Sequence, residues 1–127
     1  MAKKILVVDD EPYMLEIIRA RLVSNGYVVV TAVNGEDCLK KAEDDIPDLI
    51  LMDILLPGKS GFEVVKHLKE NDKTKDIPVI MVTALMGQDV VAKSLKSGVT
   101  YFISKPFDSE ELLYDIKKVL DKYDSKK

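Results

Sequence analysis

Five short apolar runs alternate along the chain with five longer amphipathic segments. Three of these runs, at 5–8, 49–52 and 79–82, are apolar throughout and lack the polar alternation of a half-exposed strand. Such strands are buried on both faces, as in a parallel sheet covered by helices on both sides. Two further runs lie at 28–32 and 101–103. The alternation predicts an α/β fold with a doubly wound, five-stranded parallel sheet and five helices.

Capping residues mark the helices expected between these strands. Pro12 suits the first position of the first helix, and Gly26 after Asn25 favours the left-handed turn that ends it. The fourth helix, over 88–97, is the least defined, because it has few strong apolar anchors beyond Val91 and Leu95. The other three helices each begin with a capping pair: Asn34 with Asp37, Ser60 with Glu63, and Asp108 with Glu111.

The length and composition fit one domain. The chain has 127 residues, of which 46% are hydrophobic, enough for a single core. We expect this domain to cover residues 1–123 and a polar tail to cover 124–127. The net charge of −3 and the scattered basic residues argue against nucleic acid binding.

The chain is expected to be cytoplasmic. No apolar stretch approaches the roughly 20 residues that cross a bilayer, and the basic start runs straight into a strand where a signal peptide would have its apolar core. The one cysteine, Cys38, cannot form an internal disulfide, which agrees with a reducing compartment. Its position beside Leu39 and Ala42 favours a packed thiol over a reactive one.

Polar and charged residues follow four of the expected strands. Asp9 and Asp10 follow the first strand, Asp53 the third, Thr83 the fourth and Lys105 the fifth. Ligands of open parallel sheets bind beyond the carboxyl ends of the strands, so these side chains are expected to share one crevice. Clustered carboxylates require a cation, and their hard oxygens suit Mg²⁺. A lysine and a hydroxyl beside them suit a phosphoryl group, with a carboxylate as the nucleophile.

Each of these residues alone has a simpler interpretation. An acidic residue at a strand end is commonly a helix cap or a solvated loop charge. Lys105 alone would be a solvated surface lysine, and Thr83 alone a hydroxyl bonded to backbone. The occurrence of all of them at one sheet edge is what favours a functional site.

Four stretches of sequence together resemble a response-regulator receiver domain of two-component signalling, similar to the chemotaxis receiver. They are Ile-Leu-Val-Val-Asp-Asp-Glu-Pro at 5–12, Leu-Met-Asp-Ile-Leu-Leu-Pro at 51–57 with Gly61, Val-Thr-Ala at 82–84, and Lys-Pro-Phe at 105–107. The resemblance covers essentially the whole chain. It implies a flavodoxin-like fold with strand order 2-1-3-4-5.

The resemblance also implies roles for the acidic residues. Asp53 would accept a phosphoryl group from a phosphohistidine on a sensor histidine kinase or a histidine phosphotransfer protein. Asp10 and Asp53 would bind Mg²⁺ directly, Asp9 would hold metal-bound water, and the backbone carbonyl of Leu55 would complete the protein's ligands. The receiver would catalyse its own phosphoryl transfer and slow dephosphorylation, and would not be an enzyme for other substrates.

Three further residues would form the switch. Lys105 would pair with the acyl phosphate, Thr83 would move to hydrogen-bond it, and Phe102 would rotate inward. These movements would change the surface formed by the fourth helix, the fifth strand and the fifth helix. Phe102 stands where a tyrosine is frequent in the family, so it has no hydroxyl for an output partner. The resemblance also implies a cis peptide bond between Lys105 and Pro106.

Other functions on a similar sheet have different signatures. A flavin carrier would carry a Ser/Thr/Gly-rich loop after the first strand, and a haloacid-dehalogenase-like phosphatase an Asp-x-Asp pattern there, whereas this chain has Asp-Asp-Glu-Pro. The alternative that stays open is a phosphorylation-independent interaction module on the same fold. The sequence also leaves open the kinase, the downstream target, a phosphorylation-linked homodimer, and whether the chain stands alone or belongs to a longer regulator.

Overall fold

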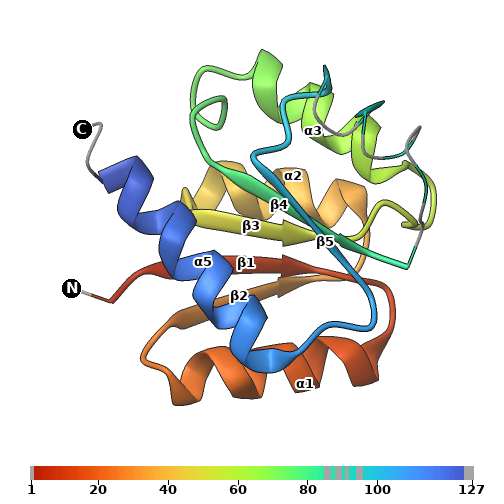
Figure 1. The fold of residues 1–127 in the computed structure, drawn as a ribbon. Helices are drawn as coiled ribbons and strands as arrows, with labels where there is room; N and C mark the ends of the chain where they lie inside the picture. Colours follow the sequence, from red (N-terminus) through yellow and green to blue (C-terminus); the bar gives the residue numbers. More distant parts are fainter. Residues whose placement is uncertain (1, 85–86, 88–89, 91, 94–95, 125–127) are drawn as a thin grey trace.

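The computed structural model describes residues 2–84, 87, 90, 92–93 and 96–124. Its sheet has five parallel strands in the order β2-β1-β3-β4-β5, which confirms the predicted topology (Figure 1). The strands are β1 (Lys4–Val8), β2 (Val28–Ala32), β3 (Leu49–Met52), β4 (Val79–Thr83) and β5 (Tyr101–Ser104). The helices described along their whole length are α1 (Pro12–Ser24), α2 (Gly35–Asp45), α3 (Gly61–Glu70) and α5 (Ser109–Asp124).

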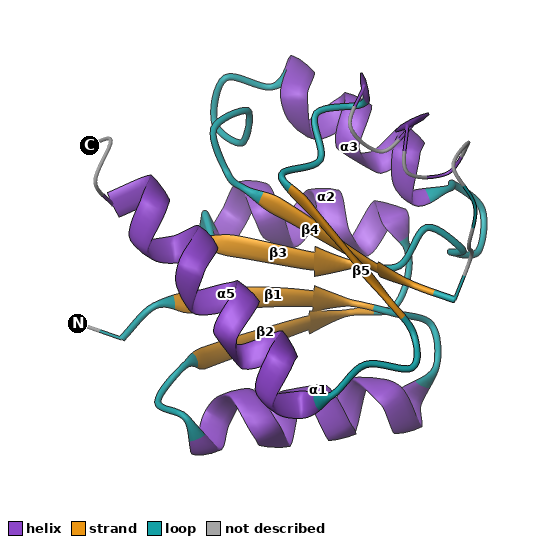
Figure 2. Cartoon of the chain, in the orientation of Figure 1, coloured by secondary structure: helices purple, strands orange, loops and turns teal. Residues whose placement is uncertain are grey.

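Helices cover both faces of the sheet (Figure 2). On one face α1 and α5 pack against alternate strand residues such as Ile5 and Val7, with Leu22 and Ile116 fully buried between them. On the other face α2 and α3 cover the intervening residues, such as Leu6. This arrangement explains why the central strands are apolar at every position, because both faces of each strand are buried.

The helix ends largely follow the predicted caps. The Asn34 carboxamide oxygen accepts a hydrogen bond from the Asp37 backbone N–H at 2.8 Å, and the Ser60 hydroxyl accepts one from Glu63 at 3.3 Å. At the start of α5 the Asp108 carboxylate accepts a hydrogen bond from the backbone N–H of Glu110, at 2.9 Å, where the spacing predicted the N–H of Glu111. Either position can be satisfied by a capping side chain, because the first four N–H groups of a helix lack intrahelical partners.

The fourth expected helix falls partly outside the described residues. Positions 88–89, 91 and 94–95 are among those not described, and they include both of its expected apolar anchors, Val91 and Leu95. The described residues 90, 92–93 and 96 are helical. The segment is therefore described only at separate positions.

The carboxyl-terminal helix α5 reaches Asp124, the last residue that the structure describes. There the Asp124 carboxylate pairs with the Lys3 ammonium at 2.7 Å, which joins the end of α5 to the start of β1. Along the described part of the chain, no helix combines the length and apolar content needed to cross a bilayer.

Candidate functional site at the carboxyl ends of the strands

The register of the sheet brings the predicted site residues to one edge. Val8 at the end of β1 pairs with Met52 at the end of β3, so Asp9 and Asp53 follow neighbouring strands at the same level. At the end of β4 Thr83 pairs with Ser104, and the next residue, Lys105, donates its backbone N–H to the Thr83 carbonyl at 2.8 Å.

A lysine ammonium joins two buried carboxylates at the centre of this edge. The Lys105 Nζ lies 2.8 Å from Asp53 Oδ2 and 3.0 Å from Asp9 Oδ2. Asp9 is 4% exposed and Asp53 is 9% exposed, so neither carboxylate can rely on bulk water for its solvation. Charged groups are buried at acceptable cost only when they are paired and hydrogen-bonded. Lys105 therefore compensates the charge of both acids.

The second oxygen of each carboxylate is held by backbone. Asp9 Oδ1 accepts a hydrogen bond from the Glu11 N–H at 3.0 Å, and Asp53 Oδ1 accepts one from the Leu55 N–H at 3.1 Å. Each acid thus bonds the backbone two residues ahead, as Asp commonly does in a turn. These bonds fix the orientation of both carboxyl groups at the strand ends.

The pKa of the Lys105 ammonium reflects opposing influences. Burial by itself lowers the pKa of this group, but its hydrogen bonds to Asp53 and Asp9 and the negative charge of both acids together outweigh that effect. The net result is a pKa raised above the ordinary lysine value. Lys105 therefore stays protonated at neutral pH.

Gly61, the first residue of α3, lets that helix approach Asp53 closely. A Cβ atom built on Gly61 would lie 2.6 Å from the Asp53 carbonyl oxygen and 2.9 Å from the Ile54 Cα. The Gly61 N–H also donates to the Ile54 carbonyl at 2.7 Å. In the sequence, this glycine is indicated only as part of the family motif. A glycine at the start of a helix, where better helix formers are available, was the signal that could have indicated one.

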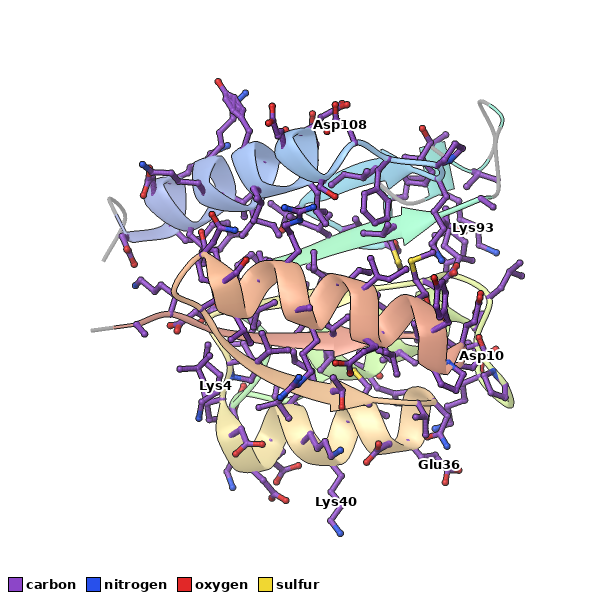
Figure 3. All side chains as sticks on the ribbon, turned by 90° about the horizontal axis from the view of Figure 1, so that it is seen from below. Lys4, Asp10, Glu36, Lys40, Lys93 and Asp108 are labelled. Atoms are coloured by element: carbon purple, nitrogen blue, oxygen red, sulfur yellow. The ribbon has the colours of Figure 1, made fainter. Side chains whose placement is uncertain are left out.

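The other predicted site residues surround this ionic cluster. Asp10 lies at the same edge with its side chain exposed (Figure 3). Thr83 is fully buried at the end of β4, whereas the Leu55 side chain is 58% exposed. Phe102 is half-buried and packs against the core beneath α2 and α3. The predicted Lys105–Pro106 cis peptide bond is confirmed.

The carboxylates of the site have the right chemistry for a hard cation, but they are not arranged around a common point in this structure. Within the described residues, no three His, Cys, Asp or Glu side chains are grouped so as to hold a metal ion. The predicted convergence of three carboxylates is thus seen for Asp9 and Asp53, which share Lys105, while Asp10 is exposed to solvent. Carboxylate oxygens at a partly open edge are the donor type that Mg²⁺ prefers, so the residues present fit that ion.

Comparison with known proteins identifies relatives over almost the entire chain. The chain matches the family model of the response regulator receiver domain over residues 5–117. It is 40% identical over 120 residues to the phosphate regulon transcriptional regulatory protein PhoB of Escherichia coli, covering 94% of this chain and 52% of PhoB. It is 38% identical over 119 residues to the response regulator PleD of Caulobacter vibrioides, covering 94% of this chain and 26% of PleD. The chain thus spans about half the length of PhoB and about a quarter of the length of PleD.

Solved structures of similar size have the same fold. A CheY-like response regulator receiver domain protein from Methanospirillum hungatei superposes with a TM-score of 0.94 at 31% identity, with 100% of both chains covered. The chemotaxis protein CheY4 of Vibrio cholerae gives a TM-score of 0.89 at 31% identity, covering 94% of this chain and 99% of CheY4. Together with the family match, these relatives show that the chain belongs to the response regulator receiver domain family of two-component systems.

Proposed function

We propose that this receiver is a phosphorylation-activated switch that accepts a phosphoryl group on Asp53. The donor is a phosphohistidine on a sensor histidine kinase or a histidine phosphotransfer protein. The observation that carries this proposal is the Lys105 ammonium, 2.8 Å from Asp53 and 3.0 Å from Asp9 at the carboxyl edge of the sheet. A buried carboxylate with a fixed cation beside it is the arrangement that an aspartyl phosphate requires.

The proposed transfer needs one nucleophile and a means of neutralising charge. A carboxylate oxygen of Asp53 attacks the phosphorus of the phosphohistidine, and the new P–O bond forms as the P–N bond breaks. The electron pair of the P–N bond returns to the imidazole nitrogen, which takes up a proton from solvent. The Leu55 N–H holds Asp53 Oδ1 in place, and the Lys105 ammonium attracts the phosphoryl oxygens.

Mg²⁺ completes the proposed site. Asp10 and Asp53 are proposed as direct ligands together with the backbone carbonyl of Leu55, and Asp9 as the holder of metal-bound water. When bound, the ion supplies positive charge that reduces repulsion between the acidic residues and the incoming phosphoryl group. Asp10 is suited to be a ligand because its carboxylate is exposed next to Asp9 in the chain and, among the described residues, has no bond to give up.

The proposed response to phosphorylation runs through Thr83 and Phe102. The phosphoryl group adds a charge of about −1.5 to −2, the Thr83 hydroxyl turns toward it, and Phe102 moves inward. Phe102 in β5 is already half-buried against the core beneath α2 and α3, so its rotation would alter the surface around β5. A downstream protein or an attached output domain would recognise the altered surface. The receiver would act as a signal and not as an enzyme for other substrates.

Phosphorylation of wild type, Asp53→Asn and Asp44→Asn tests the proposal. Asp44 is an exposed carboxylate on α2, so its substitution makes the same chemical change away from the site. With acetyl phosphate and Mg²⁺, wild type and Asp44→Asn should gain the mass of one phosphoryl group, and Asp53→Asn should gain none. Chelation of Mg²⁺ should prevent the gain in wild type and in Asp44→Asn.

Two further measurements separate the alternatives. Beryllofluoride with Mg²⁺ should shift the amide signals around Thr83 and Phe102 in wild type and leave Asp53→Asn unchanged. Equal responses in both proteins, or no response in either, would favour the phosphorylation-independent interaction module. Sedimentation before and after phosphorylation tests whether the switch also forms a homodimer.

A further inference from the structure

A pocket of about 180 Å³ lies between β5 and the first half of α5. A single water occupies roughly 10–15 Å³ on this measure, so the pocket has room for the head group of a large side chain. β5 is the last strand of the sheet, so the pocket is at the sheet's outer edge. Its wall includes Tyr101, Phe102, Ser104, Phe107, Glu111 and Asp115.

Asp115 is the unusual residue in this wall. It is 9% exposed, as buried as Asp53, yet within the described residues its carboxylate makes no hydrogen bond and no ion pair. In the same part of the chain, no fully enclosed side-chain oxygen or nitrogen lacks a partner. The Asp115 oxygens must therefore reach solvent, and the pocket is the opening that this residue lines. An unpaired carboxylate in so buried a position is costly, and a cation in the pocket would offset that cost.

The rest of the wall defines which cation fits. Glu111 lies one helical turn before Asp115, so both carboxylates lie on the same side of α5. Lys118, one turn later, is exposed and forms no ion pair with either acid among the described residues. Tyr101 and Phe107 also line the pocket, but the surface that its wall exposes is mostly polar. A guanidinium group binds carboxylates through two parallel hydrogen bonds, which a compact ammonium cannot form in the same fixed geometry.

We propose that this pocket binds an arginine side chain of the protein on which the switch acts, held by the carboxylates of Asp115 and Glu111. The binding of arginine depends only on the pocket, whereas the assignment of its owner as the downstream target rests on the proposed function. Phe102, the proposed switch residue, also lines the pocket, so a rearrangement at this position of β5 would change the wall that the arginine contacts.

A second copy of this chain is a poor occupant. In a symmetric contact through this face, the pocket would meet residues of the same face of the other copy, and β5 and α5 carry no arginine. The two arginines of the chain, Arg19 and Arg21, both lie on α1. Insertion of either into the pocket of another copy would make a head-to-tail contact, which closes only in rings or grows into filaments. A different protein that presents an arginine is the occupant that the charges favour.

Titration of the protein with N-acetyl-arginine amide, followed by amide spectra, tests the pocket directly. Saturable shifts are expected at Tyr101, Ser104 and Asp115. N-acetyl-citrulline amide, which has the same shape without the charge, should bind at least tenfold more weakly, as should N-acetyl-arginine amide with Asp115→Asn protein. Asp44→Asn is the matched control and should bind like wild type. Equal binding of the citrulline compound, or undiminished binding by Asp115→Asn, would overturn the proposal.

A repeat of the titration in the presence of beryllofluoride and Mg²⁺ tests the link to the switch. Movement of Phe102 should change the affinity for N-acetyl-arginine amide by about threefold or more. An unchanged affinity in protein whose Asp53 is shown to be modified would overturn the assignment of the arginine to the downstream target. If Asp53 takes up no ligand at all, the proposed function fails, and the first titration still decides whether the pocket binds arginine.

Discussion

Two aspartates of this receiver are equally buried and are treated in opposite ways. Asp53, at the end of β3, has a lysine ammonium at 2.8 Å on one oxygen and a backbone N–H at 3.1 Å on the other. Asp115, in the middle of α5, has neither within the described residues and faces a pocket. Burial alone therefore does not identify the role of a carboxylate. The groups that pair with the carboxylate identify its role: Asp53 has the Lys105 ammonium beside it, whereas Asp115 has no cation among the described residues.

Substitution of Lys105 should have the largest effect on stability. Lys105→Met removes the shared cation and leaves Asp9 and Asp53 buried without it, which we expect to lower the free energy of unfolding by about 3 kcal/mol. Lys40→Met is the control, because Lys40 is exposed on α2 and points into solvent (Figure 3). Its effect should stay within about 0.5 kcal/mol. Urea unfolding of the three proteins provides the measurement. Equal stabilities would show that the carboxylates do not depend on the lysine.

Gly61→Ala should destabilise the protein by about 2 kcal/mol, because the new methyl group would collide with the backbone of Asp53 and Ile54. Gly35→Ala is a matched control at the first position of α2. Its Cβ would meet a Val64 methyl group at 2.7 Å, which is one side-chain atom and not backbone. Thermal unfolding should therefore give a smaller loss for Gly35→Ala than for Gly61→Ala. The reverse order would mean that α3 can withdraw from Asp53 at little cost.

Alkaline pH should weaken the lysine-centred site selectively. The pKa of Lys105 is raised in the folded protein, so its contribution to stability is complete below the lysine pKa of about 10.4 and is lost as pH rises through the folded-state value. Above about pH 10.4, the free energy of unfolding should therefore fall more steeply for wild type than for Lys105→Met. Parallel pH curves would contradict the assigned pKa direction.

One control removes a second alkaline effect. Burial raises the pKa of the Cys38 thiol to about 12, with a smaller contribution from the Asp37 charge. This thiol also favours the folded state below its unfolded pKa and loses that contribution as pH rises toward 12. Both proteins should therefore carry Cys38→Ala, so that the difference between their curves reports Lys105.

The sequence predicted the lysine-centred site well because strand ends obey topology. Once 5–8 and 49–52 were recognised as buried parallel strands, Asp9 and Asp53 had to share an edge. The strand order itself came from the family resemblance and is confirmed. The exposed position of Asp10 was not foreseeable, because the direction of a loop side chain depends on local hydrogen bonds, here that of Asp9 to the Glu11 N–H.

The sequence did not indicate the pocket at Asp115. In the sequence, Asp115 is one acidic residue between Tyr114 and Ile116 in an amphipathic helix, a position that usually faces solvent. Asp115 comes to line a pocket with β5 only through the tertiary placement of α5 beside that strand, which no local pattern in the sequence marks. The helix cap at Asp108 is a smaller example. The sequence spacing predicted a hydrogen bond to the Glu111 N–H, and in the structure the Glu110 N–H makes it.

Asp115→Asn should change stability least and so completes the contrast with Lys105. The carboxylate has no partner to lose within the described residues, and an amide of nearly the same shape carries no charge that burial would penalise. We therefore expect the free energy of unfolding to stay within about 0.5 kcal/mol of wild type or to rise slightly. Urea unfolding at neutral pH measures this. A loss of 2 kcal/mol or more, on the order of a broken buried hydrogen bond to a charge, would reveal an internal partner for Asp115 and would leave its pocket without the unpaired charge that an arginine is proposed to meet.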